Sequence, residues 1–199
     1  MDEASGATAL DSLGVNDLAN NGTVGTAAGR VGTSRVMSTG NYLSAASASA
    51  YDYSTGQAFT VAAWAYPTSK KAFGMVVAKD NSWVLRMDSL GTGWEFTDTV
   101  NPGARTPGVA TLNAWHLLVA RYDPSVGMGE FSLSVNGGAS TGNAPAFPLG
   151  SIKVVQFGAR DGANPFFGRV DEVGIWSRLL TAAEETTLYN AGAGTTYPF

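Results

Sequence analysis

The sequence predicts an all-β protein, a sandwich of two antiparallel sheets followed by one short helix near the C-terminus. Short apolar stretches recur along the chain with turn residues between them. This pattern indicates antiparallel hairpins rather than alternating strands and helices. With 199 residues the chain is long enough for one such sandwich. We therefore expect a single domain over residues 1–199.

The middle of the chain has the clearest strand signals. Apolar residues alternate up to Pro67, which has no amide hydrogen to donate to a neighbouring strand. Farther on, Gly91-Thr-Gly93 is a hairpin signal between two alternating runs. We expect these segments to form a meander of four strands, at residues 59–66, 74–79, 83–87 and 94–96.

A second hairpin is predicted after this meander. Residues 114–122 form an apolar run, and Phe131, Leu133 and Val135 alternate up to Asn136-Gly137, a strong hairpin signal. These two strands should therefore pair. A further short strand is expected at residues 154–158.

The closing segment, residues 166–194, predicts a strand, a turn and a helix in that order. The apolar spacing of the strand slips near Asp171-Glu172, which indicates a β-bulge. Thr181-Ala-Ala-Glu184 has the form of a capping box and should begin the helix. We expect Gly192 to end it.

Composition excludes several classes of function. The formal net charge is −4, so the chain has no basic surface suited to nucleic acid. Cysteine is absent, which rules out disulfides, thiol catalysis and thiolate metal sites. The sequence contains neither a signal peptide nor an apolar run long enough for membrane insertion. Low charge with 25 glycines and five tryptophans is typical of an exposed β-rich module on a cell or particle surface.

The closing segment resembles the concanavalin A-like jelly rolls called laminin-G-like and pentraxin modules. Their last strand commonly reads Gly-x-hydrophobic-Asp-Glu-Val-x-Ile-aromatic before a Leu-Ser/Thr-x-x-Glu helix, as residues 168–184 do. Residues 115–123 are similar to the family's Trp-x-His-hydrophobic-hydrophobic-Ala-x-Tyr-Asp, and residues 135–137 to its Val-Asn-Gly. The resemblance implies a jelly roll of two antiparallel sheets.

The beginning of the chain departs from this family pattern. In most relatives an aromatic strand precedes an Asp-x-Ser-Gly turn, and here Met1 stands where that strand should end. We expect either that the first family strand is missing before Met1 or that a partner chain supplies this edge.

No residue pattern for catalysis is found. Glucanases with this fold carry Glu-x-Asp-x-(x)-Glu on one strand, whereas Glu95 and Asp98 are three residues apart and should point to opposite faces. The single histidine, His116, lacks the partners of a zinc site, and we expect it to be a strand residue bonded to a neighbour. We therefore expect no enzyme activity.

Calcium is the ion that the resemblance implies, held by loop oxygens at one end of the sandwich. The candidate metal ligands are Asp80, Asn81 and Asp161, the last with Asn164 beside it. Local turn formation is the alternative for all of them. Asp171 is expected to bond the bulged backbone or the N-terminal turn instead.

Sugar recognition needs exposed aromatic rings beside amides and carboxylates. The resemblance places Trp64, Trp115 and Trp176 in the core. The candidate ligand-binding residues are therefore those near turns, with strand packing as the alternative for the first of them: Trp83, Trp94, Phe73, Phe166 and Asn164.

Two functions remain open. The first is a non-catalytic module on an extracellular surface that recognises a glycan or a protein partner through loops at one sandwich edge. The second is a virion component, such as a phage capsid decoration, head fibre or tail adhesion protein, that binds a capsid or tail lattice. The sequence leaves oligomerisation open for both.

Overall fold

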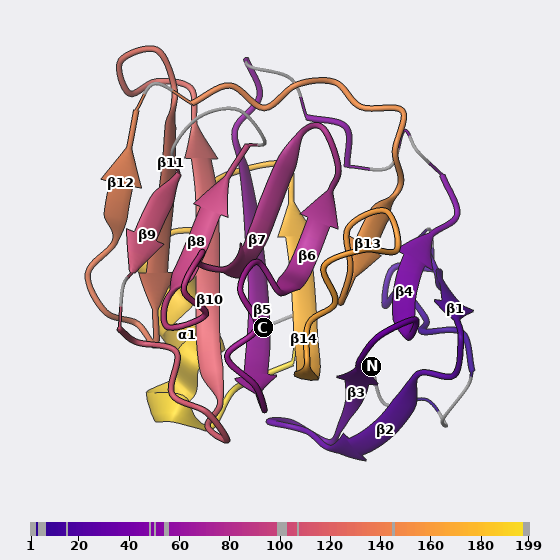
Figure 1. The fold of residues 1–199 in the computed structure, drawn as a ribbon. Helices are drawn as coiled ribbons and strands as arrows, with labels where there is room; N and C mark the ends of the chain where they lie inside the picture. The colour runs from indigo at the N-terminus through magenta and orange to yellow at the C-terminus, as the bar shows by residue number, and fades with distance from the viewer. Residues whose placement is uncertain are drawn as a thin grey trace.

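Two antiparallel sheets stack face to face in the computed structural model, which describes residues 3, 7–14, 16–47, 49, 51–53, 56–98, 103–106, 108–144 and 146–196 (Figure 1). Within these residues each sheet has seven strands. The first sheet contains, in spatial order, β1 (Leu18–Asn21), β4 (Tyr42–Ala45), β13 (Val155–Phe157), β6 (Met75–Lys79), β7 (Trp83–Met87), β8 (Trp94–Thr97) and β9 (Ala104–Thr106). The second contains β12 (Thr141–Asn143), β11 (Glu130–Val135), β10 (His116–Asp123), β5 (Phe59–Pro67), β14 (Gly168–Trp176), β3 (Thr33–Met37) and β2 (Gly25–Ala28).

The predicted hairpins are present in this arrangement. Strands β6, β7 and β8 pair in succession as a meander. The expectation that residues 59–66 belong to this meander is wrong, because β5 lies in the opposite sheet between β10 and β14. Strands β10 and β11 pair from Leu118 with Val135 to Asp123 with Glu130, as Asn136-Gly137 indicated. The all-β sandwich and its main pairings are therefore confirmed.

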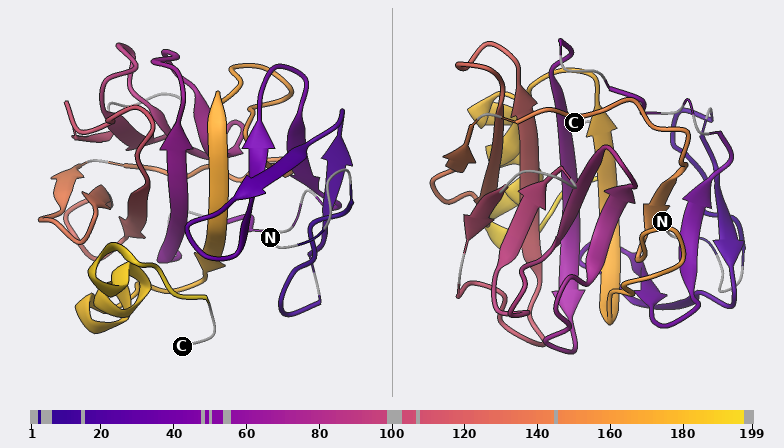
Figure 2. Two further views of the ribbon diagram at one scale, coloured as in Figure 1. Left: turned by 90° about the horizontal axis from the view of Figure 1, so that it is seen from below. Right: turned by 45° about the horizontal axis from the view of Figure 1, so that its top comes forward.

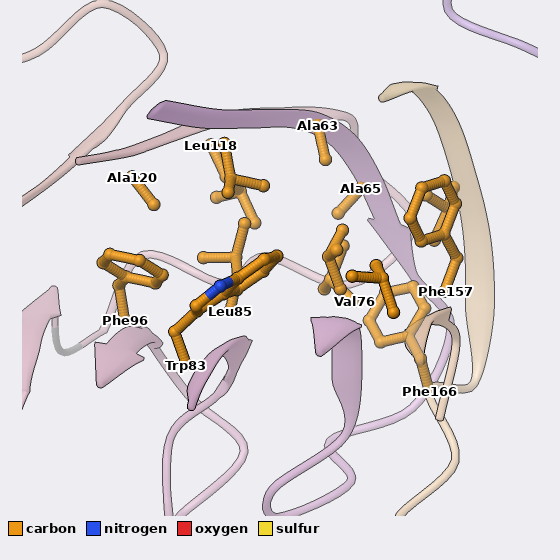
Figure 3. Close-up of a cluster of buried hydrophobic side chains, with 14 of the residues drawn as sticks. Ala63, Ala65, Val76, Trp83, Leu85, Phe96, Leu118, Ala120, Phe157 and Phe166 are labelled. Carbon is orange, nitrogen blue, oxygen red and sulfur yellow. The ribbon is translucent and has the colours of Figure 1, made fainter. Parts of the chain in front are cut away.

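The core between the sheets is rich in aromatic rings. Phe59 stacks on Tyr53 at a centroid separation of 4.5 Å and also contacts Trp83, Phe96 and Tyr122 within 6.1 Å. Figure 3 shows side chains of both sheets meeting in this layer. Alanines on β5 leave room for these large rings, so that the two sheets can interlock.

The bulge in β14 lies where the sequence predicted it. The pairing of β14 with β5 shifts register between Asp171 and Gly174, and Glu172 has a φ of 43°. The Asp171 carboxylate is buried and accepts hydrogen bonds from the amides of Arg30 and Val31 at 2.7 and 3.0 Å and from that of Glu172 at 3.0 Å. It therefore holds the bulge, as expected, and also the turn between β2 and β3, which was not predicted.

A short helix, α1 (Ala182–Tyr189), covers the outer face of the second sheet (Figure 2). Thr181 and Glu184 form the predicted capping box. The expected end at Gly192 is wrong, because Asn190 adopts the left-handed conformation that closes α1 and begins the 3₁₀ turn η1 (Asn190–Gly192). Leu188 packs against the outer face of β5 and β10, and Glu185 forms an ion pair with Arg121.

In the described part of the chain, no helix is long and apolar enough to cross a bilayer.

Candidate functional site

A groove with a volume of about 520 Å³ lies beside the second half of β14. It opens there because β3 pairs only with Gly168, Arg169 and Val170, whereas β14 continues to Trp176. In Figure 1 β14 lies between β5 and β3, in the order that the second sheet has. The groove is lined by Ala9, Leu10, Asp11, Ser12, Leu13, Asn16, Leu18, Tyr51, Phe157, Glu172, Val173, Gly174, Ile175, Trp176, Leu188, Thr195 and Thr196.

The inner wall of the groove is apolar. Val173 and Ile175 point toward the core, where they are only half-buried. Leu18 of β1 and Phe157 of β13 line the same side from the first sheet. The groove thus reaches the space between the two sheets.

The outer wall is aromatic and polar. Trp176 is half-buried, and its six-membered ring lies directly over Gly174, where an added Cβ would overlap the ring. Thr195 and Thr196 bring hydroxyl groups from the C-terminal tail, and Glu172 brings a carboxylate. An indole beside hydroxyl and carboxylate oxygens can stack on a sugar ring and bond its hydroxyls.

The far wall is the loop around Asp11. Its carboxylate oxygens accept hydrogen bonds from the amides of Leu13 at 3.2 Å and Asn16 at 3.0 Å, which shapes the loop. The Tyr51 hydroxyl is hydrogen bonded to the Asn16 side chain. Burial, together with the negative charge of Asp11, raises the pKa of Tyr51, so the phenol stays protonated and able to donate.

The charged side chains among the described lining residues of the groove are all negative. Its carboxylates are those of Asp11 and Glu172, and the described lining residues include no lysine or arginine. An acidic ligand would meet like charges there, whereas a neutral or basic ligand would not.

Three of the predicted ligand-binding side chains are fully buried. Trp83, Trp94 and Phe166 each have 0% exposed surface and pack between the sheets. For them the prediction of an aromatic platform is wrong, although they lie close to turns in the sequence. Strand alternation turns Trp83 on β7 and Trp94 on β8 into the core, and Phe166, just before β14, packs there against Trp94.

The other two candidates lie together outside the groove. Phe73 is 38% exposed, and the Arg86 guanidinium lies 4.8 Å from the centre of its ring. The Asn164 carbonyl accepts a hydrogen bond from the amide of Met75 at 3.1 Å, which brings this loop close to Phe73. Ligand binding by Phe73 and Asn164 stays a prediction.

The calcium candidates are partly engaged in ion pairs. Asp80 contacts Arg160 at 3.3 Å, and Asp161 contacts Lys153 at 2.7 Å, while Asn81 occupies a left-handed turn position. Among the described residues, no three histidine, aspartate or glutamate side chains are placed to share a metal ion. Calcium would have to compete with these cations, and its binding stays a prediction.

The residues considered for catalysis are held by their neighbours. Glu95 forms ion pairs with Arg86 and Arg105 at 2.9 and 3.1 Å. His116 is buried, its Nε2 lies 3.0 Å from the Thr111 carbonyl oxygen, and burial lowers its pKa. The predicted role of His116 as a bonded strand residue is therefore confirmed.

The groove itself was not predicted from the sequence. Trp176 was expected in the core, and Tyr51, Asp11 and Glu172 were not singled out for binding. The one local signal was glycine two residues before tryptophan on a strand, which frees the surface beneath the indole.

The fold is an all-β sandwich of two antiparallel sheets, with a groove beside its last strand. A family model described as the concanavalin A-like lectin/glucanases superfamily matches residues 37–184. The chain belongs to this superfamily. A comparison of the sequence with curated proteins finds no match.

Solved structures with the same fold have low sequence identity to the chain. Domain 4 of AbnA, a GH43 extracellular arabinanase from Geobacillus stearothermophilus in complex with arabinotriose, has a TM-score of 0.62 at 18% identity, with 94% of this chain and 98% of that one covered. The binding domain of Paraclostridial Mosquitocidal Protein 1 has a TM-score of 0.66 at 16% identity, with 95% of this chain and 52% of that one covered. The botulinum neurotoxin serotype G binding domain has a TM-score of 0.69 at 16% identity, with 92% of this chain and 48% of that one covered. The chain thus spans about half of each toxin domain.

Proposed function

We propose that the protein is a non-catalytic carbohydrate-binding module and that a neutral oligosaccharide binds in the groove beside β14. The observation that carries this proposal is the half-buried indole of Trp176 beside Glu172, Thr195 and Thr196. A ring face stacks on the C–H groups of a sugar, and the oxygens around it bond the hydroxyls.

The comparisons support a sugar as the ligand. The arabinanase domain, which this chain covers almost completely, is in complex with arabinotriose. Two other similar structures are described as binding domains. From these similarities we also infer that the module binds at an extracellular surface and that it has no catalytic role.

The negative charge of the groove favours neutral over acidic sugars as its ligand. Asp11 and Glu172 disfavour uronic acids and other acidic sugars, because like charges would be brought together in a partly enclosed site. A neutral pentose or hexose oligomer carries no such penalty.

Calorimetric titration tests the proposal with arabinotriose and trigalacturonic acid as probes. Wild type should bind arabinotriose and not the acidic trimer, and Trp176→Ala should lose about 1 to 2 kcal/mol of binding, roughly a tenfold or greater loss of affinity. Trp115→Ala is the matched control, because Trp115 lies on the outer face of the same sheet but outside the groove. No measurable binding of neutral oligosaccharides, or an equal loss of affinity in both variants, would reject glycan binding at this site.

A protein partner, including a capsid or tail lattice, is the second candidate function. The observation in its favour is the half-buried apolar wall of Val173 and Ile175 in the groove, which apolar side chains of a partner can cover. Co-sedimentation with particles, which should be abolished by substitutions in the groove, tests this role.

A further inference from the structure

A second depression lies at the end of the sandwich where β6, β8 and β10 begin (Figure 1). Loops of residues 68–74 after β5, 88–93 after β7 and 108–113 before β10 meet there. None of its lining residues belongs to the groove beside β14. The depression has a volume of about 590 Å³ and is lined by Lys70, Thr92, Gly108, Ala110, Thr111 and Leu112.

Hydrogen bonds hold these loops against one another. The Phe73 amide donates to the Asp88 carbonyl oxygen at 3.1 Å. The Ala110 amide donates to the Thr92 carbonyl oxygen at 3.0 Å. The Asp88 carboxylate is buried and accepts hydrogen bonds from the amides of Leu90 and Thr92 at 3.0 and 2.9 Å. The surface is therefore preformed, and a ligand would lose little affinity to the ordering of these loops.

Exposed positive charge gathers at this end. Lys70 and Lys71 are both exposed, and neither forms an ion pair within the described part of the chain. Arg86 and Arg105 lie on neighbouring strands and share one carboxylate, that of Glu95, at 2.9 and 3.1 Å. The described lining of the depression includes no carboxylate. On a chain with a formal net charge of −4, such an end would attract an acidic ligand.

Each of these loops also exposes an apolar side chain. Phe73 is 38% exposed, Leu90 75% and Val109 39%. The Arg86 guanidinium lies 4.8 Å from the centre of the Phe73 ring and holds one side of it. Apolar side chains of a partner would remove this surface from water, which is favourable. An acidic sugar has no such side chains, so lysines beside apolar residues favour an acidic polypeptide.

We propose that this end of the sandwich binds an acidic segment of a partner protein. Lys70 and Lys71 pair with aspartate or glutamate carboxylates of the segment. Leucine or phenylalanine side chains of the segment cover Phe73, Leu90 and Val109. The site lies apart from the groove beside β14, so the proposal does not rest on glycan binding there. The module can then hold a sugar and a protein at the same time.

Fluorescence anisotropy on the full chain tests the proposal with a labelled and blocked peptide, Glu-Asp-Leu-Glu-Asp-Phe-Glu. At low ionic strength Lys70→Glu should weaken its binding about tenfold, because an attractive charge becomes a repulsive one. Lys153→Glu is the matched control, since it makes the same change in net charge. The Lys153 carbonyl accepts a hydrogen bond from Lys79, at the opposite end of β6. Its substitution should leave the affinity within about twofold.

The apolar part of the contact has its own test. The same peptide with serine in place of leucine and phenylalanine should bind wild type several-fold more weakly. Leu90→Ser should weaken binding of the original peptide to a similar degree. Ile152→Ser is the control for this variant, because Ile152 is 88% exposed beside Lys153 and should not touch the peptide.

Three results would overturn the proposal. The first is no binding of the peptide at millimolar concentration. The second is an equal loss of affinity in Lys70→Glu and Lys153→Glu, which would mean attraction to overall charge alone. The third is displacement of the labelled peptide by trigalacturonic acid or a heparin-derived hexasaccharide at a lower concentration than unlabelled peptide requires, because the site would then recognise an acidic sugar.

Discussion

Gly174 and Trp176 determine the shape of the groove through a single contact. They are two residues apart on β14 and share its outer face, so the indole ring lies on the glycine backbone. No side chain at position 174 separates the ring from the strand backbone. The position of the indole thus depends on the absence of a side chain at Gly174 as much as on Trp176 itself.

Gly174→Ala should displace the indole without removing it. An added methyl group overlaps the ring, and overpacking of this kind typically costs about 1 to 3 kcal/mol. We expect lower affinity for arabinotriose, measured by titration, together with a lower unfolding midpoint in urea. Gly56→Ala is the control, since a Cβ at Gly56 would meet nothing within 4 Å. Unchanged affinity in Gly174→Ala would show that the ring position is irrelevant to binding.

Helix α1 shows how a short element is held by its ends. With eight residues it is too short to be stable alone, and its capping box and its packing on β5 and β10 fix it. Hydrogen bonds from Arg178, then the Thr181 amide, lower the pKa of Glu184 from 4.5 to about 2. The negative charge also suits the positive end of the helix.

This shifted pKa predicts a pH dependence of stability. A carboxyl group whose pKa is lower in the folded than in the unfolded state contributes stability above about pH 4.5, and that contribution is lost as the pH falls toward about 2. Urea unfolding at pH 5 and pH 2.5 should show a larger loss for wild type than for Glu184→Gln, which keeps a side chain able to cap. Equal losses in both proteins would contradict this role of Glu184.

Across the whole molecule, local signals predicted most strands from β5 onward but not the groove. Alternation and Asn136-Gly137 identified the β10–β11 hairpin, and Thr181 with Glu184 marked the start of the helix, because these features depend on neighbours in the sequence. β9 and β12 are only three residues long and gave no signal.

The groove could not be predicted from the sequence because the residues that form its walls are far apart along the chain. Asp11, Tyr51 and Trp176 meet only after the sheets have formed. Proximity to a turn misled the choice of Trp83 and Trp94, since a ring beside a turn still points inward when its strand position does. Placing an aromatic residue inside or outside a sandwich requires the register of its strand.

The binding surface itself can be located by amide chemical shifts. During a titration with arabinotriose, the largest changes should fall on Gly174, Ile175, Trp176, Thr195 and Thr196, with little change in the loops of Phe73 and Asn164. Such a map would place the ligand on the outer wall of the groove. Changes centred on Phe73 and Asn164, with residues 172–176 unaffected, would contradict a binding site beside β14.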